Sequence, residues 1–351
     1  MVRKIRLIVC DYDNPKGYTF PSFGFGSSEK RLWHFAKTAS ELEGVEVIIT
    51  GPLWLREYVP KARYFPKRLN IETYQEFLDE YGKCDFLFAG HEYFDKDEWV
   101  KPFEKCANVL LSYQLHPYQY LKPSFNGKDK ILFCYSDQMM KDYKEQKPVK
   151  ALLFHSGVDE EPYFVEKHEN YLLWMGRLDR DKAPHYAVEA AKILGMPLYI
   201  LGKTVYQPEY YEANKETFSG KDIHLMGVRF GVEKMEILTK AACFVYTIDK
   251  SYSEAGAGVL GEALSCGIPI AGISWTGNDA VCEAVSSDLG KIADVHSLKE
   301  GEIAQALADA VRYCLTLNRK KIYEIGSEKY NPHKLVRQLL DTALDLNRNN
   351  R

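Results

Sequence analysis

The amino-acid sequence predicts an α/β protein with two domains, each built on a parallel sheet whose strands are joined by crossover helices. Short apolar runs alternate with longer stretches of helical periodicity, which is the pattern of βαβ units. This pattern starts again in the stretch "EEPYFVEKHENYLLWMGR", and 351 residues are enough for about two domains. We therefore expect two Rossmann-like halves that meet between residues 157 and 170.

The first half contains six apolar runs with the length and composition of buried strands. One further stretch, Ser28–Leu42, carries its apolar residues at helical spacing and predicts an amphipathic helix. The strands are expected at Ile5–Cys10, Val45–Thr50, Asp85–Ala89, Asn108–Ser112, Lys130–Tyr135 and Val149–Phe154.

The second half repeats the alternation and ends in an amphipathic helix within "NPHKLVRQLLDTALDL". Its strands are expected at Tyr171–Met175, Leu198–Leu201, Ile223–Met226, Cys243–Thr247 and Ile268–Ile273. Its other helices are expected at Ala183–Leu194, Val232–Ala241 and Val259–Cys266, the last closed by a glycine.

The composition argues against several classes of protein. The formal net charge of -3 gives no global positive field, so no nucleic-acid partner is expected. No run of 18 apolar residues occurs, and the apolar run near the N-terminus is too short for a signal peptide. The eight cysteines form no CxxC pair, which is typical of buried thiols in a reducing compartment rather than of zinc ligands. We expect a cytoplasmic protein.

A glycine-rich loop, "IDKSYSEAGAG", lies between a predicted strand and the predicted helix Val259–Cys266. Its glycines let the backbone approach a ligand closely, and its amides converge on a helix N-terminus, which favours phosphate or another anion. Open α/β sheets bind ligands beyond the carboxyl ends of their strands, where this loop is expected.

Two glutamates, Glu254 and Glu262, bracket the end of this loop and the start of the helix. Carboxylates suit hydroxyl groups rather than phosphates, because an ionised carboxylate accepts hydrogen bonds. A ligand with sugar, diphosphate and ribose would place the sugar hydroxyls at Glu254, the diphosphate at the amides and the ribose at Glu262. The alternative is that Glu254 caps a helix and Glu262 faces solvent.

Two cations follow the predicted strand Tyr171–Met175 in the stretch "GRLDRDK". Arg177 and Lys182 would then point to the same carboxyl edge of the sheet. Two cations together with loop amides can stabilise a leaving diphosphate without a metal ion. The alternative is that both are solvated surface charges.

Together, "GRLDRDK" and "EAGAGVLGEALSCGIPIAG" resemble the retaining GT-B glycosyltransferases of family 4 (glycosyl transferases group 1), whose second motif is the E-x7-E signature. The resemblance is specific from about Leu152 to Glu283. It implies a GT-B fold, with two Rossmann-like domains whose parallel sheets face across a cleft. An acceptor domain is expected at 1–160 and a nucleotide-sugar donor domain at 165–330, with the helix 331–349 packing back on the first.

The resemblance implies transfer of a sugar from a UDP-, GDP- or ADP-sugar to an acceptor hydroxyl with retention of configuration, without metal or cofactor. The implied catalytic residues are Glu254, His116, Arg177 and Lys182. The implied donor-binding residues are Gly26, Ser27, Arg177, Lys182, Gly227, Val228, Glu254, Ala255, Gly256, Ala257, Gly258, Val259 and Glu262. The resemblance also implies that the nucleotide base lies near Gly227–Phe230 and that the acceptor is a glycan, a lipid-linked molecule or a small molecule.

The sequence departs from the family pattern at two positions. Ser27 replaces the second glycine of a loop that approaches the diphosphate, and Ala183 replaces the glycine that follows the family lysine. Two D-x-D stretches, Asp11–Asp13 and Asp179–Asp181, would suit a metal ion on a diphosphate, although in the second Asp181 could simply orient Lys182.

Two other functions compete with transfer: a nucleotide-sugar epimerase of the same fold and a non-catalytic protein that binds sugar nucleotides or glycans. The stretch "REYVPKARYFPKR" mixes cations with Tyr58, Tyr64 and Phe65. It predicts either a solvated loop or a surface in peripheral contact with an anionic membrane or a phosphate-bearing acceptor.

Overall fold

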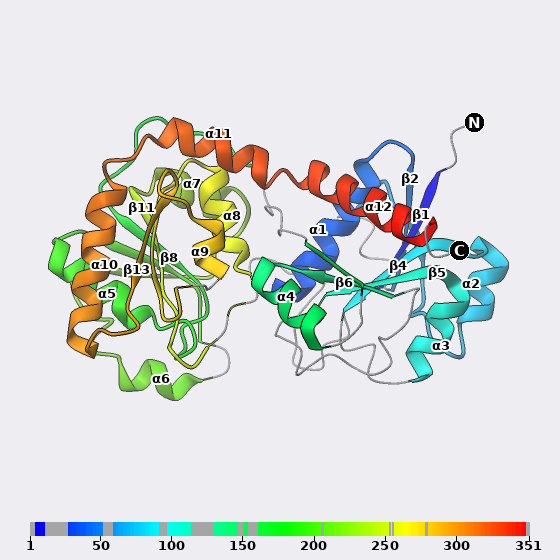
Figure 1. Cartoon of the computed structure of the whole chain (residues 1–351), viewed down its shortest axis with the longest axis horizontal. Helices are drawn as coiled ribbons and strands as arrows, with labels where there is room; N and C mark the ends of the chain where they lie inside the picture. Colours follow the sequence, from blue (N-terminus) through cyan, green and yellow to red (C-terminus); the bar gives the residue numbers. More distant parts are fainter. Residues whose placement is uncertain are drawn as a thin grey trace. The chain divides into compact units, whose positions relative to one another are not determined.

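The chain divides into two compact units, each described here by itself (Figure 1). One unit comprises Met1–Ser156 and Pro332–Arg351, and the other comprises Gly157–Asn331. The computed structural model describes residues 4–10, 27–51, 59–90, 97–113, 130–146, 150–153, 161–204, 207–252, 254, 256–277 and 280–348.

A seven-stranded parallel sheet forms the centre of the first unit, in the order β3-β2-β1-β4-β5-β6-β7. Because β1 lies in the middle and the chain adds strands first on one side and then on the other, the fold is doubly wound. The strands are β1 (Ile5–Cys10), β2 (Val45–Thr50), β3 (Arg63–Phe65), β4 (Cys84–Gly90), β5 (Ala107–Tyr113), β6 (Lys130–Cys134) and β7 (Lys150–Leu153).

Helices of the first unit cover this sheet, and the last helix of the chain belongs to the same unit. They are α1 (Ser27–Glu41), α2 (Tyr74–Tyr81), α3 (Asp97–Cys106), α4 (Asp137–Gln146) and α12 (Pro332–Arg348). Helix α12 packs on α1, where His333 Nε2 lies 2.8 Å from Glu41 Oε2 and Arg337 bonds to the carbonyl of Glu43.

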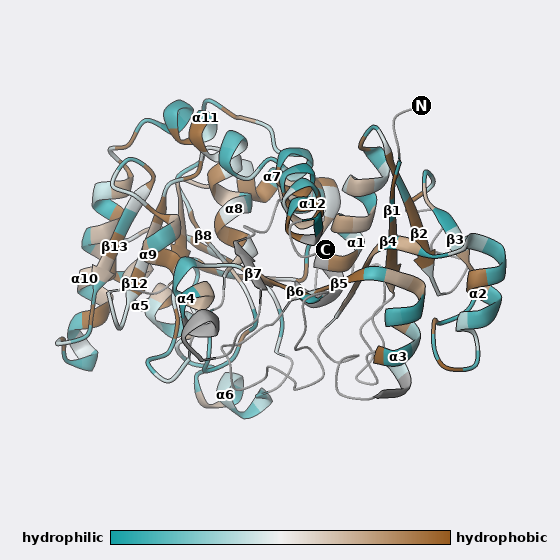
Figure 2. Ribbon diagram, turned by 45° about the vertical axis from the view of Figure 1, so that its right-hand side comes forward, coloured by the Kyte–Doolittle hydropathy of each residue, from teal (hydrophilic) through white to brown (hydrophobic). Residues whose placement is uncertain are grey.

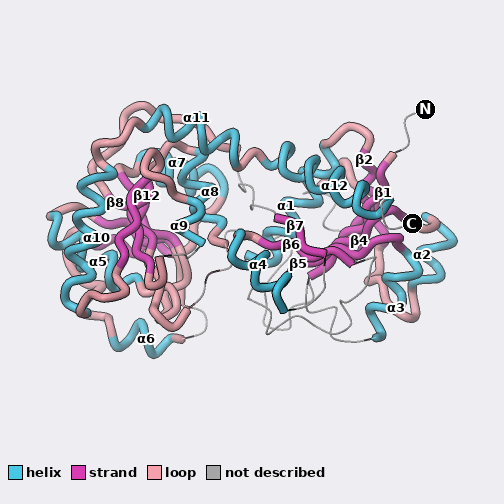
Figure 3. The backbone as a smooth tube through the Cα atoms, in the orientation of Figure 1, coloured by secondary structure: helices cyan, strands magenta, loops and turns pink. Residues whose placement is uncertain are grey.

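A parallel sheet forms the centre of the second unit (Figure 3). It has six strands in the order β10-β9-β8-β11-β12-β13. The strands are β8 (Leu172–Met175), β9 (Leu198–Leu201), β10 (Ile223–Gly227), β11 (Cys243–Tyr246), β12 (Ile270–Ser274) and β13 (Gly290–Asp294). The helices are α5 (Pro184–Leu194), α6 (Pro208–Ala213), α7 (Gly231–Lys240), α8 (Gly258–Ser265), α9 (Ala280–Ala284), α10 (Glu300–Cys314) and α11 (Arg319–Lys329).

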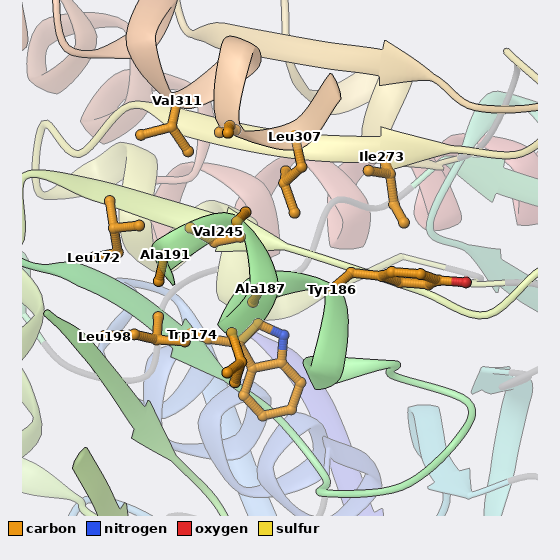
Figure 4. Packing of buried hydrophobic residues seen from close by; sticks show 14 of the residues in the cluster. Leu172, Trp174, Tyr186, Ala187, Ala191, Leu198, Val245, Ile273, Leu307 and Val311 are labelled. Carbon is orange, nitrogen blue, oxygen red and sulfur yellow. The ribbon is translucent and has the colours of Figure 1, made fainter. Parts of the chain in front are cut away.

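Each face of the second sheet carries its own hydrophobic core, because successive side chains of a strand point to opposite faces. Leu172 and Trp174 of β8 pack with α5 and α10 on one face (Figure 4). Leu173 packs with α7, α8 and α11 on the other face. Strands that are buried on both faces are therefore mostly apolar, and Figure 2 shows the hydrophobic colour along much of β1, β2 and β8.

The structure contains every strand that the sequence predicts, with shifts at the strand ends. Strand β12 begins at Ile270 rather than at Ile268, since Pro269 has no N–H for the ladder. Strands β3 and β13 were not predicted, because β3 has only three residues and β13 is a partly exposed edge strand whose sequence, "GKIAD", carries two charges.

The described part of the basic aromatic stretch does not form an aromatic surface. Tyr64 and Phe65 belong to β3 and are buried, so they do not form part of a contact surface, and Tyr58 lies outside the described residues. The neighbouring Arg63 lies 3.0 Å from Glu46, and Lys67 lies 2.6 Å from Glu76. None of the described helices combines the length and the apolar character needed to cross a bilayer.

Candidate active site

The topology of the second sheet brings the predicted site residues together. Strands β8 and β11 are neighbours in the sheet, although β9 and β10 lie between them in the sequence. At such a switch point the loops after the two central strands diverge and leave room for a ligand. Arg177 and Lys182 are on the loop after β8, and Glu254 is on the loop after β11.

An ion pair joins the two loops. The Lys182 ammonium contacts Oε2 of Glu254, and both side chains are largely buried. Burial opposes the charge on Lys182, but the neighbouring Glu254 outweighs it and raises the pKa of the lysine. The Tyr252 ring lies 4.6 Å from the same ammonium, and the Tyr246 hydroxyl donates to Glu254 Oε2 at 3.4 Å. Lys182 and Glu254 are therefore neither solvated charges nor helix caps.

Two carboxylates hold the Arg177 guanidinium. Nη1 lies 2.7 Å from Oδ2 of Asp179, and Nη2 donates to Oδ2 of Asp181 at 3.2 Å. Asp179 is fully buried, and its Oδ1 accepts the amide N–H of Lys182 at 3.2 Å. The side chain of Asp181 contacts Arg177, whereas the ammonium of Lys182 contacts Glu254. Both carboxylates of this D-x-D stretch are engaged with Arg177, a partner that the sequence did not indicate for either of them.

A tight turn connects Lys182 to helix α5. Ala183 adopts the left-handed conformation, with φ 43° and ψ 50°, and Pro184 begins the helix, where its missing N–H costs nothing. The Thr247 hydroxyl donates to the carbonyl of Lys182 at 2.7 Å and accepts from Trp174 Nε1 at 2.9 Å. The turn therefore keeps a conformation suited to glycine, although the sequence places alanine there.

We expect Ala183→Gly to change the free energy of unfolding by less than about 1 kcal/mol. Relief of the left-handed strain, about 1–2 kcal/mol, opposes the loss of one buried methyl group, about 0.8 kcal/mol, and the added chain entropy of glycine. Ala183→Val should instead lower the free energy of unfolding by about 2 kcal/mol or more, because a β-branched residue is strained in this conformation and overpacks the core. Urea-induced unfolding measures both changes, and a valine variant as stable as the parent would contradict this account of the turn.

Three glycines lie at the carboxyl ends of β8, β9 and β10, beside Arg177. The Gly176 amide donates to Leu201 at 3.0 Å, and the Gly202 amide donates to Gly227 at 2.9 Å. A Cβ on Gly202 would lie 1.8 Å from the carbonyl oxygen of Gly176. The backbones are therefore in direct contact at this edge, where Gly202, just after β9, lies between Gly176, just after β8, and the predicted residue Gly227 of β10.

The start of helix α8 carries the predicted diphosphate-binding amides. Gly256 has a φ of 158°, Ala257 is the N-cap residue, and Gly258 and Val259 begin the helix. No side chain among the described residues caps this helix at Ala257. Amides in the first turn of such a helix are positioned to donate to an anion.

Glu262 lies inside the protein rather than in solvent, and it has a partner that the sequence did not reveal. Its Oε1 atom accepts from Nζ of Lys234 on α7 at 2.9 Å. Only 8% of Glu262 and 4% of Lys234 are exposed. The alternative in which Glu262 faces solvent is therefore wrong. No sequence signal marks Lys234, because α7 also carries ordinary surface charges such as Glu233.

Several predicted residues lie outside the described residues, namely Gly26, His116 and Ala255, together with Asp11–Asp13. Ser27 begins α1. The roles assigned to all of these residues stay predictions.

The described part of the site contains two cations, Arg177 and Lys182, and three carboxylates, Asp179, Asp181 and Glu254. Burial raises the pKa of Asp179 above its usual value, against the effect of Arg177. An anion would therefore be held here by directed N–H donors rather than by an excess of positive charge.

The second unit matches a family of enzymes. Residues 158–328 match the family described as Glycosyl transferases group 1. No curated protein matches the sequence.

Solved glycosyltransferases share the fold of the chain. AviGT4, which is involved in avilamycin A biosynthesis, is 16% identical with a TM-score of 0.67, and the match covers 99% of this chain and 98% of AviGT4. Anabaena HepE, solved with UDP-glucose, is 12% identical with a TM-score of 0.70, covering 96% and 100%. A glycosyltransferase from Rickettsia africae is 14% identical with a TM-score of 0.70, covering 98% of each chain. The predicted GT-B fold is confirmed.

Proposed function

We propose that this chain, a glycosyltransferase of the group 1, GT-B type, transfers a sugar from a nucleoside diphosphate sugar to an acceptor hydroxyl with retention of configuration. The observation that carries the proposal is the ion pair between Lys182 and Glu254, next to Arg177, at the switch point of the second sheet. These are the groups that a sugar and a diphosphate need side by side. Anabaena HepE, which shares the fold, was solved with UDP-glucose, which supports a nucleotide-sugar donor.

The leaving diphosphate gains negative charge as the bond to the sugar breaks. Lys182, Arg177 and the amides of Gly256–Gly258 and Gly26 would stabilise that charge. Asp179 and Asp181 hold Arg177 in a fixed orientation, so its donors need no reorganisation during the reaction. Such preorganised donors can replace a metal ion, and we propose that the enzyme needs none.

The sugar becomes oxocarbenium-like as the same bond breaks. Glu254 would hold the sugar hydroxyls, since Lys182 and Tyr246 fix the orientation of its carboxylate. We assign His116 to the sugar side of the site. The described carboxylates around Arg177 and Lys182 are all engaged in ion pairs, which favours attack from the face of the leaving phosphate over a covalent intermediate. A sugar trapped covalently on the protein would refute this course.

The experiment that tests the proposal is a panel of UDP-, GDP- and ADP-sugars. A bound donor should raise the melting temperature by mass action. The donor that does so should be turned over to free nucleoside diphosphate, and NMR of the transferred sugar should show the anomeric configuration of the donor.

Inversion of configuration would refute retention. Conversion of the nucleotide sugar to an isomer would identify an epimerase. Binding of the nucleotide sugar without turnover would identify a non-catalytic protein. Loss of activity with a chelator, restored by manganese, would refute metal independence.

The acceptor is the least defined part of the reaction. We propose a glycan, a lipid-linked molecule or a small molecule with a free hydroxyl, in the cytoplasm. Sedimentation with anionic and with neutral vesicles tests whether the protein contacts a membrane surface. If the protein sedimented with neither kind of vesicle, peripheral membrane contact would be ruled out.

We expect Glu262→Ala to weaken donor binding by about tenfold or more, because hydrogen bonds to a charged group contribute about 1.5–3 kcal/mol. The turnover of bound donor should change much less, since ribose contacts are the same in the ground state and the transition state. Calorimetry with the nucleoside diphosphate measures the affinity. An unchanged affinity would contradict the assignment of Glu262 to the ribose.

A further inference from the structure

We propose that Lys234 is a positioning residue for the ribose of the donor and that it acts through Glu262. This inference rests on the proposed function of the site. Lys234 lies in the first half of α7, and Glu262 lies in the middle of α8, 28 residues further along the chain.

The pair joins the two parts of the site that are assigned to the two ends of a nucleotide. Helix α7 begins directly after the loop at Gly227–Phe230, which the family resemblance assigns to the base. Helix α8 begins at the amides assigned to the diphosphate, and Glu262 follows Gly258 by four residues, on the same face of the helix. In a nucleoside diphosphate the ribose lies between the base and the diphosphate. Lys234 and Glu262 therefore meet where the ribose is expected.

Stability alone does not require this ion pair. A buried lysine and a buried glutamate each lose hydration, and apolar residues of similar size are often as stable in their place. A buried carboxylate stays ionised only when it is paired or hydrogen-bonded. An ionised carboxylate is the form that accepts hydrogen bonds from two hydroxyl groups. The ammonium of Lys234, 2.9 Å from Oε1, thus both keeps Glu262 ionised and fixes its direction.

The alternative is that the pair only ties α7 to α8. The neighbours of Lys234 in the helix argue against the need for such a tie. Met235 and Leu238 are already packed in the same core as Leu260 and Ala263 of α8. The two roles differ in one measurable respect, because only a positioning role depends on the ribose hydroxyls of the ligand.

The test compares the affinities of a nucleoside diphosphate and its 2′-deoxy counterpart for the full chain. UDP, GDP and ADP are used first to find the nucleotide that binds the parent protein. The parent should bind the ribonucleotide about tenfold more tightly than the deoxyribonucleotide. This is the difference in affinity expected from one hydrogen bond to a charged group. In Lys234→Gln this ratio should fall to about one, while the affinity for the deoxyribonucleotide stays unchanged. Lys234→Arg, which keeps the charge, should retain most of the ratio.

A matched control lies on the same helix. Lys240, in the last turn of α7, is 3.9 Å from Glu169 and largely exposed. Lys240→Gln should bind both nucleotides as the parent does. An unchanged ratio in Lys234→Gln would overturn the inference and leave the proposed function intact. A parent protein that binds none of the three nucleotides would instead overturn the proposed function.

Lys234→Gln leaves Glu262 buried without its cation, so a second comparison guards against misfolding. The double variant Lys234→Met with Glu262→Gln removes both charges of the buried pair, and it is compared with Glu262→Gln, in which Lys234 keeps its ammonium. If Lys234 acts only through Glu262, the two should bind the ribonucleotide equally. A further loss of tenfold in the double variant would show that Lys234 acts independently of Glu262, and would overturn the inference.

Discussion

Lys182→Ala should lower kcat about a hundredfold or more, because it removes one preorganised cation from the departing diphosphate, an effect of about 2.7–4 kcal/mol for comparable donors. The loss should appear equally in kcat and in kcat/KM, since the charge that Lys182 stabilises develops in the transition state. The same substitution leaves Glu254 without its ammonium partner, so the sugar hydroxyls would also be less well oriented. Steady-state kinetics with the donor found in the panel measures the effect.

The control for this prediction lies on the same helix. Lys192 is near the end of α5, is exposed, and donates to the carbonyl of Thr217. Lys192→Ala should leave kcat within about twofold of the parent, as expected for a surface position. If Lys182→Ala retained more than a tenth of the parent activity while remaining folded, the ion pair with Glu254 would be structural and the proposed mechanism would be wrong.

Gly202→Ala should lower the free energy of unfolding by about 3 kcal/mol or more, at the upper end of the cost of overpacking. The added Cβ would lie 1.8 Å from the carbonyl oxygen of Gly176, and that obstacle is backbone rather than a flexible side chain. The strands β8 and β9 would have to separate at their carboxyl ends. Because Arg177 follows Gly176, the folded fraction of this variant should also have lower activity than the parent. Urea-induced unfolding and kinetics measure the two effects.

Gly301→Ala is the matched control for Gly202→Ala. Gly301 lies in the first turn of α10, and no atom lies within 4 Å of a Cβ placed there. Alanine should therefore leave stability unchanged or raise it by up to about 1 kcal/mol, through lower entropy of the unfolded chain. If Gly202→Ala proved as stable as Gly301→Ala, the close contact of the two strand ends would not exist in solution.

The sequence predicted the strands of both sheets well because a strand buried on both faces is apolar along its whole length. The unit boundary in the structure, between Ser156 and Gly157, falls at the edge of the region where the pattern restarts. Strand β13 escaped prediction because it is partly exposed and two of its five residues are charged.

The candidate site could be predicted in part. Arg177, Lys182 and Glu254 were placed at one sheet edge from the order of strands and loops alone, and the structure brings Lys182 and Glu254 into contact. Asp179 could not be identified as the partner of Arg177, because a carboxylate in a charged turn is usually solvated. Its complete burial depends on how the turn packs after β8.

The sequence by itself determined which segments become strands and which end of each strand carries polar residues, because these depend on local periodicity. Only the tertiary structure decided that β8 lies beside β11, that Ala183 is left-handed, and that Lys234 meets Glu262. Residues 28 or 72 positions apart, as in the two lysine–glutamate pairs, meet only after the sheet has fixed the order of its strands. That order follows from the packing of all the helices on both faces, and no single motif contains it.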